Sequence, residues 1–324
     1  MARGRGADFD IPFEKRIASL KNLRAFFIIR KILITEGFDA IVLNTNLAAF
    51  LIRLALPKRL KKTTKVINFV HGYLFSDGKR GLKSAFFMMC ERLVRGKCDV
   101  VITMNSDDHR MATELCLARE KVIASLGVGI KKRAVITREE KLRRELSVGH
   151  CRLITFVGEL SKRKNQAFII RSLPFIRKTV GDVRLCLVGD GGERSRLSAL
   201  ARELSVDGAV IFPGYRRDAM DFISACDLYV SSALCEGMPL NVIEAMSLGK
   251  TVLVSRIKGH TDLISDGDNG YLYSPDDCAD FSNRVCSILL GERLDPERVA
   301  ASVRGYDRDV AAARISKIIA EEIS

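Results

Sequence analysis

The chain alternates short, almost wholly apolar segments with longer segments in which apolar residues recur every three or four positions. The short segments predict buried strands and the longer ones predict amphipathic helices. Strands joined through helices run parallel and are covered on both faces. Strands are expected at about 39–43, 65–70, 99–103, 121–125, 152–157, 183–188, 209–212, 227–231, 251–254 and 271–273. In the first half, helices are expected near 19–36, 46–56, 82–96 and 106–117.

A polar, highly charged segment interrupts this alternation between about residues 130 and 150. We interpret it as an interdomain linker that leads into a short helix. The predicted N-terminal domain covers residues 1–132, the linker 133–150 and the C-terminal domain 151–306. The expected fold class is α/β, with two doubly wound, Rossmann-like sheets facing a cleft, because ligands of such sheets bind outside the carboxyl ends of the strands.

Composition excludes several classes of protein. With 47% hydrophobic and 28% charged residues, the 324-residue chain is typical of globular proteins and not of disordered ones. No apolar run reaches the roughly 18 residues that span a bilayer, and the N-terminus lacks the apolar core of a signal peptide. The nine cysteines show no C-x-x-C spacing and the four histidines no paired spacing. We therefore expect a cytoplasmic protein with reduced thiols and no structural metal.

Positive charge is concentrated in the first half of the chain. Residues 1–150 hold 30 Lys and Arg against 15 Asp and Glu, whereas residues 151–324 hold 23 against 24. A basic half favours an anionic partner, either lipid headgroups at the inner face of a membrane or nucleic acid. A merely solvated basic face is the alternative. No stacked aromatic or recognition-helix pattern supports nucleic acid, so none is expected as a partner.

The stretch from Glu236 to Gly249 carries the most chemistry. It follows the predicted strand 227–231, and Pro239 suits the first position of a helix at 239–248 that Gly249 ends. The N-terminus of such a helix directs free backbone N–H groups, here from Leu240 and Asn241 onward, toward a bound phosphate. Two carboxylates flank this site, Glu236 before the turn and Glu244 on the helix.

The pattern E-G-M-P-L-N-V-I-E-A-M-S-L-G-K resembles the E-x7-E motif of the retaining GT-B glycosyltransferases of the family commonly numbered four. The resemblance implies that Glu244 holds the ribose of a nucleotide-sugar and that Glu236 lies beside the transferred sugar. It also implies that the donor diphosphate is bound by the intervening residues, Gly237, Met238, Pro239, Leu240 and Asn241. A GT-B fold is then expected, in which the last helix, near 307–322, packs back on the N-terminal domain.

Two loops of the C-terminal domain match further parts of the family pattern. Gly158 and Lys164 lie in the loop after the strand 152–157, where the family places a Gly-Arg…Lys loop on the diphosphate. Arg163 and Lys162 are weaker candidates in the same loop, which could also be simply solvated. This chain has Glu159 where the family often has Arg, so one expected cation is absent. Gly214 and Tyr215 match the family's loop near the nucleobase.

His71 lies directly after the strand 65–70, at a carboxyl end that faces the expected cleft. A lone histidine is more often structural. Its place resembles the family's His-Gly segment, however, which implies a contact between the imidazole and the donor sugar. Glu236 and His71 are therefore the two candidate catalytic residues.

Two other motifs are given structural interpretations. The run from Gly189 to Glu193 resembles part of a dinucleotide fingerprint but lacks its third glycine, so a tight turn is favoured over an NAD site. Asp266-Gly-Asp268 resembles the D-x-D metal motif of the other glycosyltransferase fold, but its flanking residues are typical of a turn. The segment Gly259-His-Thr-Asp262 is expected to shape the cleft and not to act in catalysis. No cofactor or metal is expected.

These observations predict a retaining glycosyltransferase that moves a sugar from a nucleoside diphosphate, expected to be UDP, to a glycan or lipid-linked glycan in cell-surface polysaccharide synthesis. A nucleotide-sugar epimerase of the same architecture is the enzymatic alternative. The first domain opens with a helix, whereas relatives open with a strand, a loop and a second βα unit. The N-terminal domain is thus predicted to be incomplete, with apolar faces of 22–34 and 39–43 poorly covered and transfer weak or absent.

Overall fold

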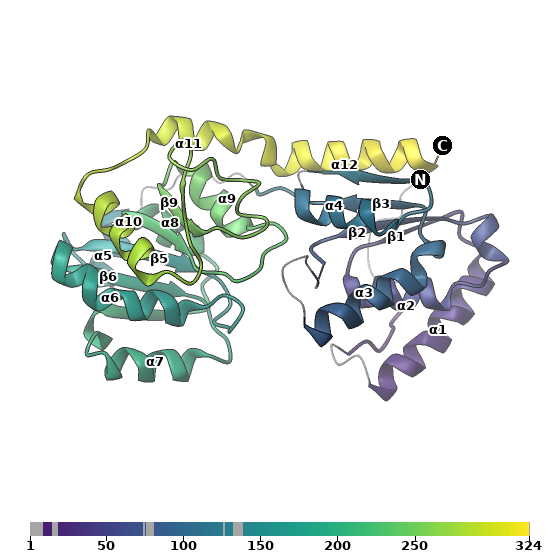
Figure 1. Ribbon diagram of the computed structural model, residues 1–324, viewed down its shortest axis with the longest axis horizontal. Coiled ribbons are helices and arrows are strands. Elements are labelled where there is room, and N and C mark those ends of the chain that lie inside the picture. The colour runs from purple at the N-terminus through teal and green to yellow at the C-terminus, as the bar shows by residue number, and fades with distance from the viewer. Residues whose placement is uncertain are drawn as a thin grey trace. The chain divides into compact units, whose positions relative to one another are not determined.

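The computed structural model describes residues 9–14, 19–73, 75, 81–125, 127–131 and 139–323. The chain forms two compact units (Figure 1). Unit 1 contains residues up to Ser125 together with Ile315–Ser324, and unit 2 contains Leu126–Arg314.

Unit 1 is built on a parallel sheet in the order β1-β2-β3-β4. Its strands are β1 (Ala40–Leu43), β2 (Lys65–Val70), β3 (Val100–Thr103) and β4 (Lys121–Ala124). Its main helices are α1 (Leu20–Glu36), α2 (Asn46–Ala55), α3 (Leu82–Val94) and α4 (Ser106–Glu114). The strand order advances in one direction, so right-handed crossovers place α2, α3 and α4 on one face of the sheet.

The last residues of α12 (Arg308–Ile323), from Ile315 onward, belong to unit 1 (Figure 1). Glu322 near its end pairs with Lys121 of β4 at 2.5 Å and with Lys65 of β2 at 3.8 Å. Within the described residues, β1 pairs with β2 alone. An apolar groove of about 290 Å³ lies along this strand, lined by residues of α1, β1 and the segment around Ile11.

Unit 2 contains a doubly wound parallel sheet in the order β10-β9-β8-β5-β6-β7. Its strands are β5 (Arg152–Val157), β6 (Val183–Val188), β7 (Val210–Gly214), β8 (Leu228–Ser231), β9 (Val252–Ser255) and β10 (Tyr271–Tyr273). Its helices are α5 (Glu139–Glu145), α6 (Gln166–Val180), α7 (Arg194–Glu203), α8 (Ala219–Ala225), α9 (Leu240–Ser247), α10 (Cys278–Leu290) and α11 (Pro296–Ser302). The strand order reverses beside β5, and ligands of such sheets bind where the order reverses.

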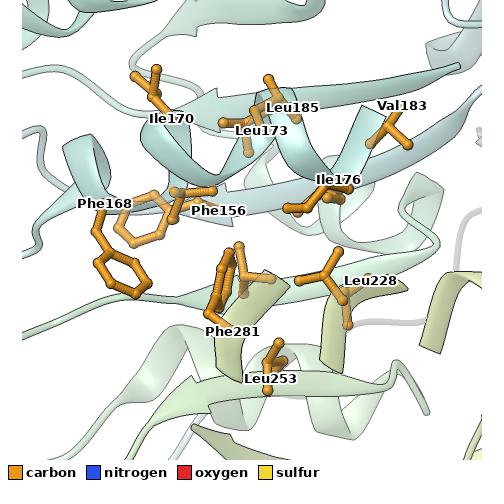
Figure 2. Close-up of a cluster of buried hydrophobic side chains, with 14 of the residues drawn as sticks. Phe156, Phe168, Ile170, Leu173, Ile176, Val183, Leu185, Leu228, Leu253 and Phe281 are labelled. Carbon is orange, nitrogen blue, oxygen red and sulfur yellow. The ribbon is translucent and has the colours of Figure 1, made fainter. Parts of the chain in front are cut away.

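The larger core of unit 2 lies between this sheet and helices α6 and α10 (Figure 2). Phe168 of α6 stacks on Tyr273 with ring centroids 5.5 Å apart, and Phe281 of α10 meets the same tyrosine edge-on at 4.8 Å. Aromatic pairs in these geometries add about 0.5–1.5 kcal/mol beyond the burial of their area. The core therefore holds the strand ends in fixed positions.

All ten predicted strands are present, with bounds within two residues of those expected. One local prediction at the proposed phosphate site was wrong. Pro239 is the N-cap of α9, with φ −85° and ψ 78°, and the helix begins one residue later, at Leu240. The Leu240 N–H donates to the carbonyl of Met238 at 3.1 Å, so it is not one of the free amides expected there.

None of the helices that the structure describes is both long enough and apolar enough to cross a bilayer. The nine cysteines are all free thiols. Burial raises the pKa of Cys98, Cys186 and Cys226 to about 12, so these thiols stay protonated and unreactive at neutral pH.

Candidate functional site

Loops at the carboxyl ends of β5, β6 and β7 are held together by backbone hydrogen bonds. The N–H of Gly158 donates to Val188 at 2.9 Å, and the N–H of Gly189 donates to Gly214 at 2.9 Å. A side chain cannot fit at Gly189, whose φ is +138° and where an added Cβ would overlap the carbonyl of Gly158. The glycine run after β6 is therefore a packing feature between neighbouring loops, as the turn interpretation predicted.

The centre of the site is an ion pair between the loop after β5 and the loop after β8. Lys164 Nζ lies 2.6 Å from Glu236 Oε1, and Arg163 Nη1 lies 3.2 Å from Glu236 Oε2. Glu236 is 7% exposed, so the carboxylate meets these cations with little competition from water. The sequence named each of these residues, but not the pairing.

Backbone contacts fix both partners of this ion pair. Ser232 Oγ donates to the carbonyl of Lys164 at 2.9 Å, and the N–H of Leu234 donates to Arg163 at 2.9 Å. Asn165 adopts a left-handed conformation, with φ 54°, where α6 begins. The two loops are therefore joined, which preorganises the cations and the carboxylate.

The loop that carries Glu236 rests on the turn after β9. Gly259 packs so closely that an added Cβ would lie 3.0 Å from the carbonyl oxygen of Glu236. Ser255 Oγ donates to Ala233 at 2.6 Å, and His260 Nδ1 lies 2.8 Å from the carbonyl of Ser255. This arrangement agrees with the predicted role of this segment in shaping the site.

His260 is fully buried beneath the site. Burial lowers its pKa to about 4, so the ring is neutral at pH 7, with its proton on Nδ1, which donates to the Ser255 carbonyl. Its Nε2 atom has no hydrogen-bond partner among the residues that the structure describes. The sequence did not distinguish this residue from a cleft-lining histidine, because burial is not visible in a four-residue turn segment.

Helix α9 is tied to the same loops. Asn241 Nδ2 donates to the carbonyl of Val157 at 2.7 Å and lies beside Gly158, so the Asn241 side chain ties α9 to the end of β5. Met238 and Leu240 pack against the second core of unit 2. Glu244 is half-buried on the first turns of α9, near Tyr229, whose pKa is raised first by burial and then by charges that include Glu244.

Tyr215 is the most exposed of the residues that the sequence predicts for donor binding in unit 2. Tyr215 is 77% exposed directly after Gly214, at the end of β7. Arg194 of α7 lies beside Gly214, with its guanidinium 5.8 Å from the centroid of the Phe212 ring. The exposed Tyr215 ring offers a flat face that a nucleobase could use.

His71 belongs to unit 1. Its Nε2 atom lies 2.6 Å from Asn44 Oδ1 and donates to it. Burial lowers the His71 pKa, so the imidazole is neutral at pH 7. Asn46 Nδ2 donates to the neighbouring Gly72 carbonyl at 2.8 Å, which fixes the segment at the end of β2.

Within the described part of the chain, no group of three or more His, Cys, Asp or Glu side chains is arranged to hold a metal. Asp266, the first acid of the D-x-D sequence, instead pairs with Arg256 at 2.8 Å and with Arg284 at 3.4 Å. Asp266 Oδ1 also accepts a hydrogen bond from the N–H of Leu272 at 2.9 Å. These contacts are those of a structural turn.

The fold and the loops define the class. A family model described as glycosyl transferases group 1 matches residues 137–307, and a glycosyl transferase 4-like domain matches residues 2–124. The chain therefore belongs to the group 1 glycosyltransferases, and its two parallel α/β units have the GT-B fold.

Relatives of known name are similar over most of the chain. EpsD of Bacillus subtilis, a protein named as a glycosyltransferase, is 26% identical over 282 residues, which cover 86% of this chain and 74% of EpsD. The Escherichia coli UDP-Gal:alpha-D-GlcNAc-diphosphoundecaprenol alpha-1,3-galactosyltransferase is 25% identical over 283 residues, 85% of this chain and 72% of that protein. The Anabaena HepE structure in complex with UDP aligns with a TM-score of 0.74 and 21% identity, over 91% of this chain and 82% of HepE.

Proposed function

We propose that the protein is a retaining glycosyltransferase that takes a sugar from a UDP-sugar and transfers it to a lipid-linked glycan in polysaccharide synthesis. The observation that carries the proposal is the buried ion pair of Lys164 and Glu236 at the carboxyl ends of β5 and β8. One carboxylate faces two cations there, so the cluster keeps a net positive charge of about one for an anionic ligand.

The leaving diphosphate is the group that most needs stabilisation. Departure of the diphosphate places negative charge on the leaving oxygens and positive charge on the sugar ring. Lys164 and Arg163 would share the phosphates, aided by the N-terminal end of α9, whose dipole favours negative charge. Glu236 would then be released to face the sugar and stabilise its oxocarbenium-like charge. In this proposal the protein itself supplies the positive charge, without a metal.

The other residues would orient the donor. Glu244, half-buried on α9, would accept hydrogen bonds from the ribose hydroxyls, and Tyr215 with Gly214 would face the base. His71 would contact the sugar as a neutral imidazole from unit 1. Glu159, which stands where the family often has Arg, cannot contribute a positive charge. Lys164 would therefore be the principal side-chain ligand of the phosphates.

The names of relatives support the choice of donor and acceptor. The Escherichia coli relative is named for a UDP-galactose donor and a diphosphoundecaprenol-linked acceptor. A Campylobacter jejuni relative, 24% identical over 226 residues, is named for an acceptor on the same kind of lipid. An enzyme with such an acceptor would work in the cytoplasm at the inner, anionic face of the membrane, where the basic first half of this chain would be attracted.

Calorimetry with UDP tests the donor site. Glu244→Ala should weaken UDP binding about tenfold or more, because the ribose would lose a charged hydrogen-bond acceptor. Glu203→Ala is the matched control, an exposed acid on α7. Equal UDP binding by wild type and Glu244→Ala would remove Glu244 from the donor site and, with it, the proposed use of the E-x7-E motif.

A further inference from the structure

Unit 1 contains an apolar groove that the donor site does not use. It has a volume of about 400 Å³ and lies between α2, α3 and the residues that follow β2. Leu47 and Phe50 of α2 form one wall, and Tyr73 and Phe75 form the base. Its size falls within the range of about 300–1,000 Å³ that small-molecule sites occupy.

The outer wall of this groove includes Phe86, Met89 and Leu93 of α3, which belong to a longer stripe of exposed apolar residues on that helix. Leu82, Phe86, Met89 and Leu93 recur at spacings of four, three and four, so they lie along one face of the helix. Leu82 is 93% exposed and Leu93 is 70% exposed. An apolar stripe of this extent on a soluble surface indicates a binding surface.

The exposed charge on α3 is entirely positive. Lys83 and Arg92 are exposed, whereas the single acid of the helix, Glu91, is buried and accepts hydrogen bonds from Nη1 and Nη2 of Arg53, each at 2.9 Å. Helix α1, which packs on the other side of α2 (Figure 1), carries four basic residues against one acid, and one of them, Lys21, pairs with Glu14 at 2.6 Å. The face of α3 beside the groove therefore exposes positive charge, which is complementary to anionic headgroups.

We propose that α3 lies in the interface of an anionic bilayer and that the groove between α2 and α3 receives a hydrocarbon chain of a membrane lipid. Long basic side chains beside apolar ones suit this position, because their charges reach the headgroups while the stripe enters the acyl region. A second copy of the chain fits less well, since a two-fold interface would oppose Lys83 and Arg92 with their own equivalents.

One end of the groove lies at the carboxyl end of β2, next to His71, where the proposed lipid-linked acceptor would have to reach. Asn46 lines the groove there and binds the Gly72 carbonyl. A lipid held here would keep its phosphate-bearing end near that sheet edge. This inference rests on the proposed lipid-linked acceptor, and it assigns the part of the protein that would meet the lipid.

The absence of tryptophan from the sequence allows a direct test. Met89→Trp places a single fluorophore on the stripe, Phe50→Trp places one in the groove, and Leu290→Trp is an exposed control on α10 of unit 2. Each variant is mixed with phosphatidylcholine vesicles, with or without phosphatidylglycerol, whose acyl chains are brominated. We expect emission from Met89→Trp and Phe50→Trp to shift to shorter wavelength and be quenched by the anionic vesicles, with little quenching of Leu290→Trp.

Other outcomes would overturn the inference. If the vesicles quench the fluorescence of Met89→Trp but not that of Phe50→Trp, no lipid chain enters the groove. If they quench Met89→Trp and Leu290→Trp equally, α3 is not the segment that contacts the membrane. If the protein binds neutral and anionic vesicles equally, charge does not contribute to docking. If the protein self-associates and does not bind vesicles, the stripe on α3 is covered by a second copy of the chain. Leu47→Trp replaces Phe50→Trp if that variant unfolds. UDP calorimetry on each variant separates these results from failure of the donor site.

Discussion

The two units of this protein use the same α/β construction but differ in what they leave at the surface. Unit 2 has a six-stranded sheet, a core of stacked aromatic rings and loops joined by backbone hydrogen bonds around Lys164 and Glu236. Unit 1 has a four-stranded sheet in the described residues, an apolar stripe on α3 and a surplus of positive charge. Unit 2 therefore presents a fixed, charged loop cluster, whereas unit 1 presents an apolar and basic surface.

The difference extends to how each unit buries charge. In unit 1, Arg53 and Glu91 form a bidentate ion pair inside the core, with Arg53 almost fully buried. Coulombic attraction from Glu91 keeps the pKa of Arg53 raised, although burial alone, the largest influence, lowers it. In unit 2 the ion pair of Lys164 and Glu236 lies in the loops at the strand ends, and the fully buried His260 is neutral. Unit 1 thus pairs charge between the helices of its core, whereas unit 2 pairs charge at its candidate site.

The largest effect is expected from breaking the ion pair of unit 1. Glu91→Leu should destabilise unit 1 by about 3–5 kcal/mol, because it leaves the Arg53 guanidinium buried without its partner. Urea unfolding followed by limited proteolysis would assign the loss to unit 1. The double variant Arg53→Met/Glu91→Leu is the control and should recover much of the stability. An unchanged unfolding midpoint for Glu91→Leu would contradict the account of this core.

A smaller effect is expected from protonating His260 in unit 2. Its pKa is about 4 in the folded protein and about 6.5 when unfolded, so its contribution is complete above pH 6.5 and is lost as the pH falls toward 4. That loss amounts to about 3 kcal/mol. His260→Asn should remove this part of the pH dependence when unfolding is measured from pH 7.5 to 4. Parallel curves for the two proteins would show that the ring titrates normally.

The smallest stability difference concerns the loop packing of unit 2. Gly189→Ala and Gly181→Ala both add a methyl group at positive φ, but only Gly189 meets backbone, whereas nothing lies within 4 Å at Gly181. Gly189→Ala should therefore cost about 1–3 kcal/mol more than Gly181→Ala. Thermal unfolding of the two variants measures the difference. Equal losses would mean that the loops after β5 and β6 can separate.

The strands were predictable because apolar runs bounded by polar segments carry a strong periodic signal, as in β5 and β6. The site was less predictable. Sequence placed Lys164 and Glu236 on separate loops, and only folding brings their side chains within 2.6 Å. The predicted start of α9 differs from the observed start by one residue, because a proline suits either the N-cap or the first turn of a helix. The apolar stripe of α3 was not recognised, since its spacing is equally typical of a core-facing helix.

Binding of UDP to Lys164→Ala and Lys162→Ala tests the central claim, that unit 2 is a donor site built on the Lys164–Glu236 pair. Lys162, a weaker candidate from the sequence, is the matched control, because it lies in the same loop but is exposed and is not part of the Glu236 ion-pair cluster, which contains Lys164 and Arg163. Losing a charged phosphate contact of about 1.5–3 kcal/mol corresponds to roughly 10- to 150-fold weaker binding. We expect calorimetry to show this loss for Lys164→Ala and affinity within twofold of wild type for Lys162→Ala. Equal affinity of Lys164→Ala and wild type would contradict the claim.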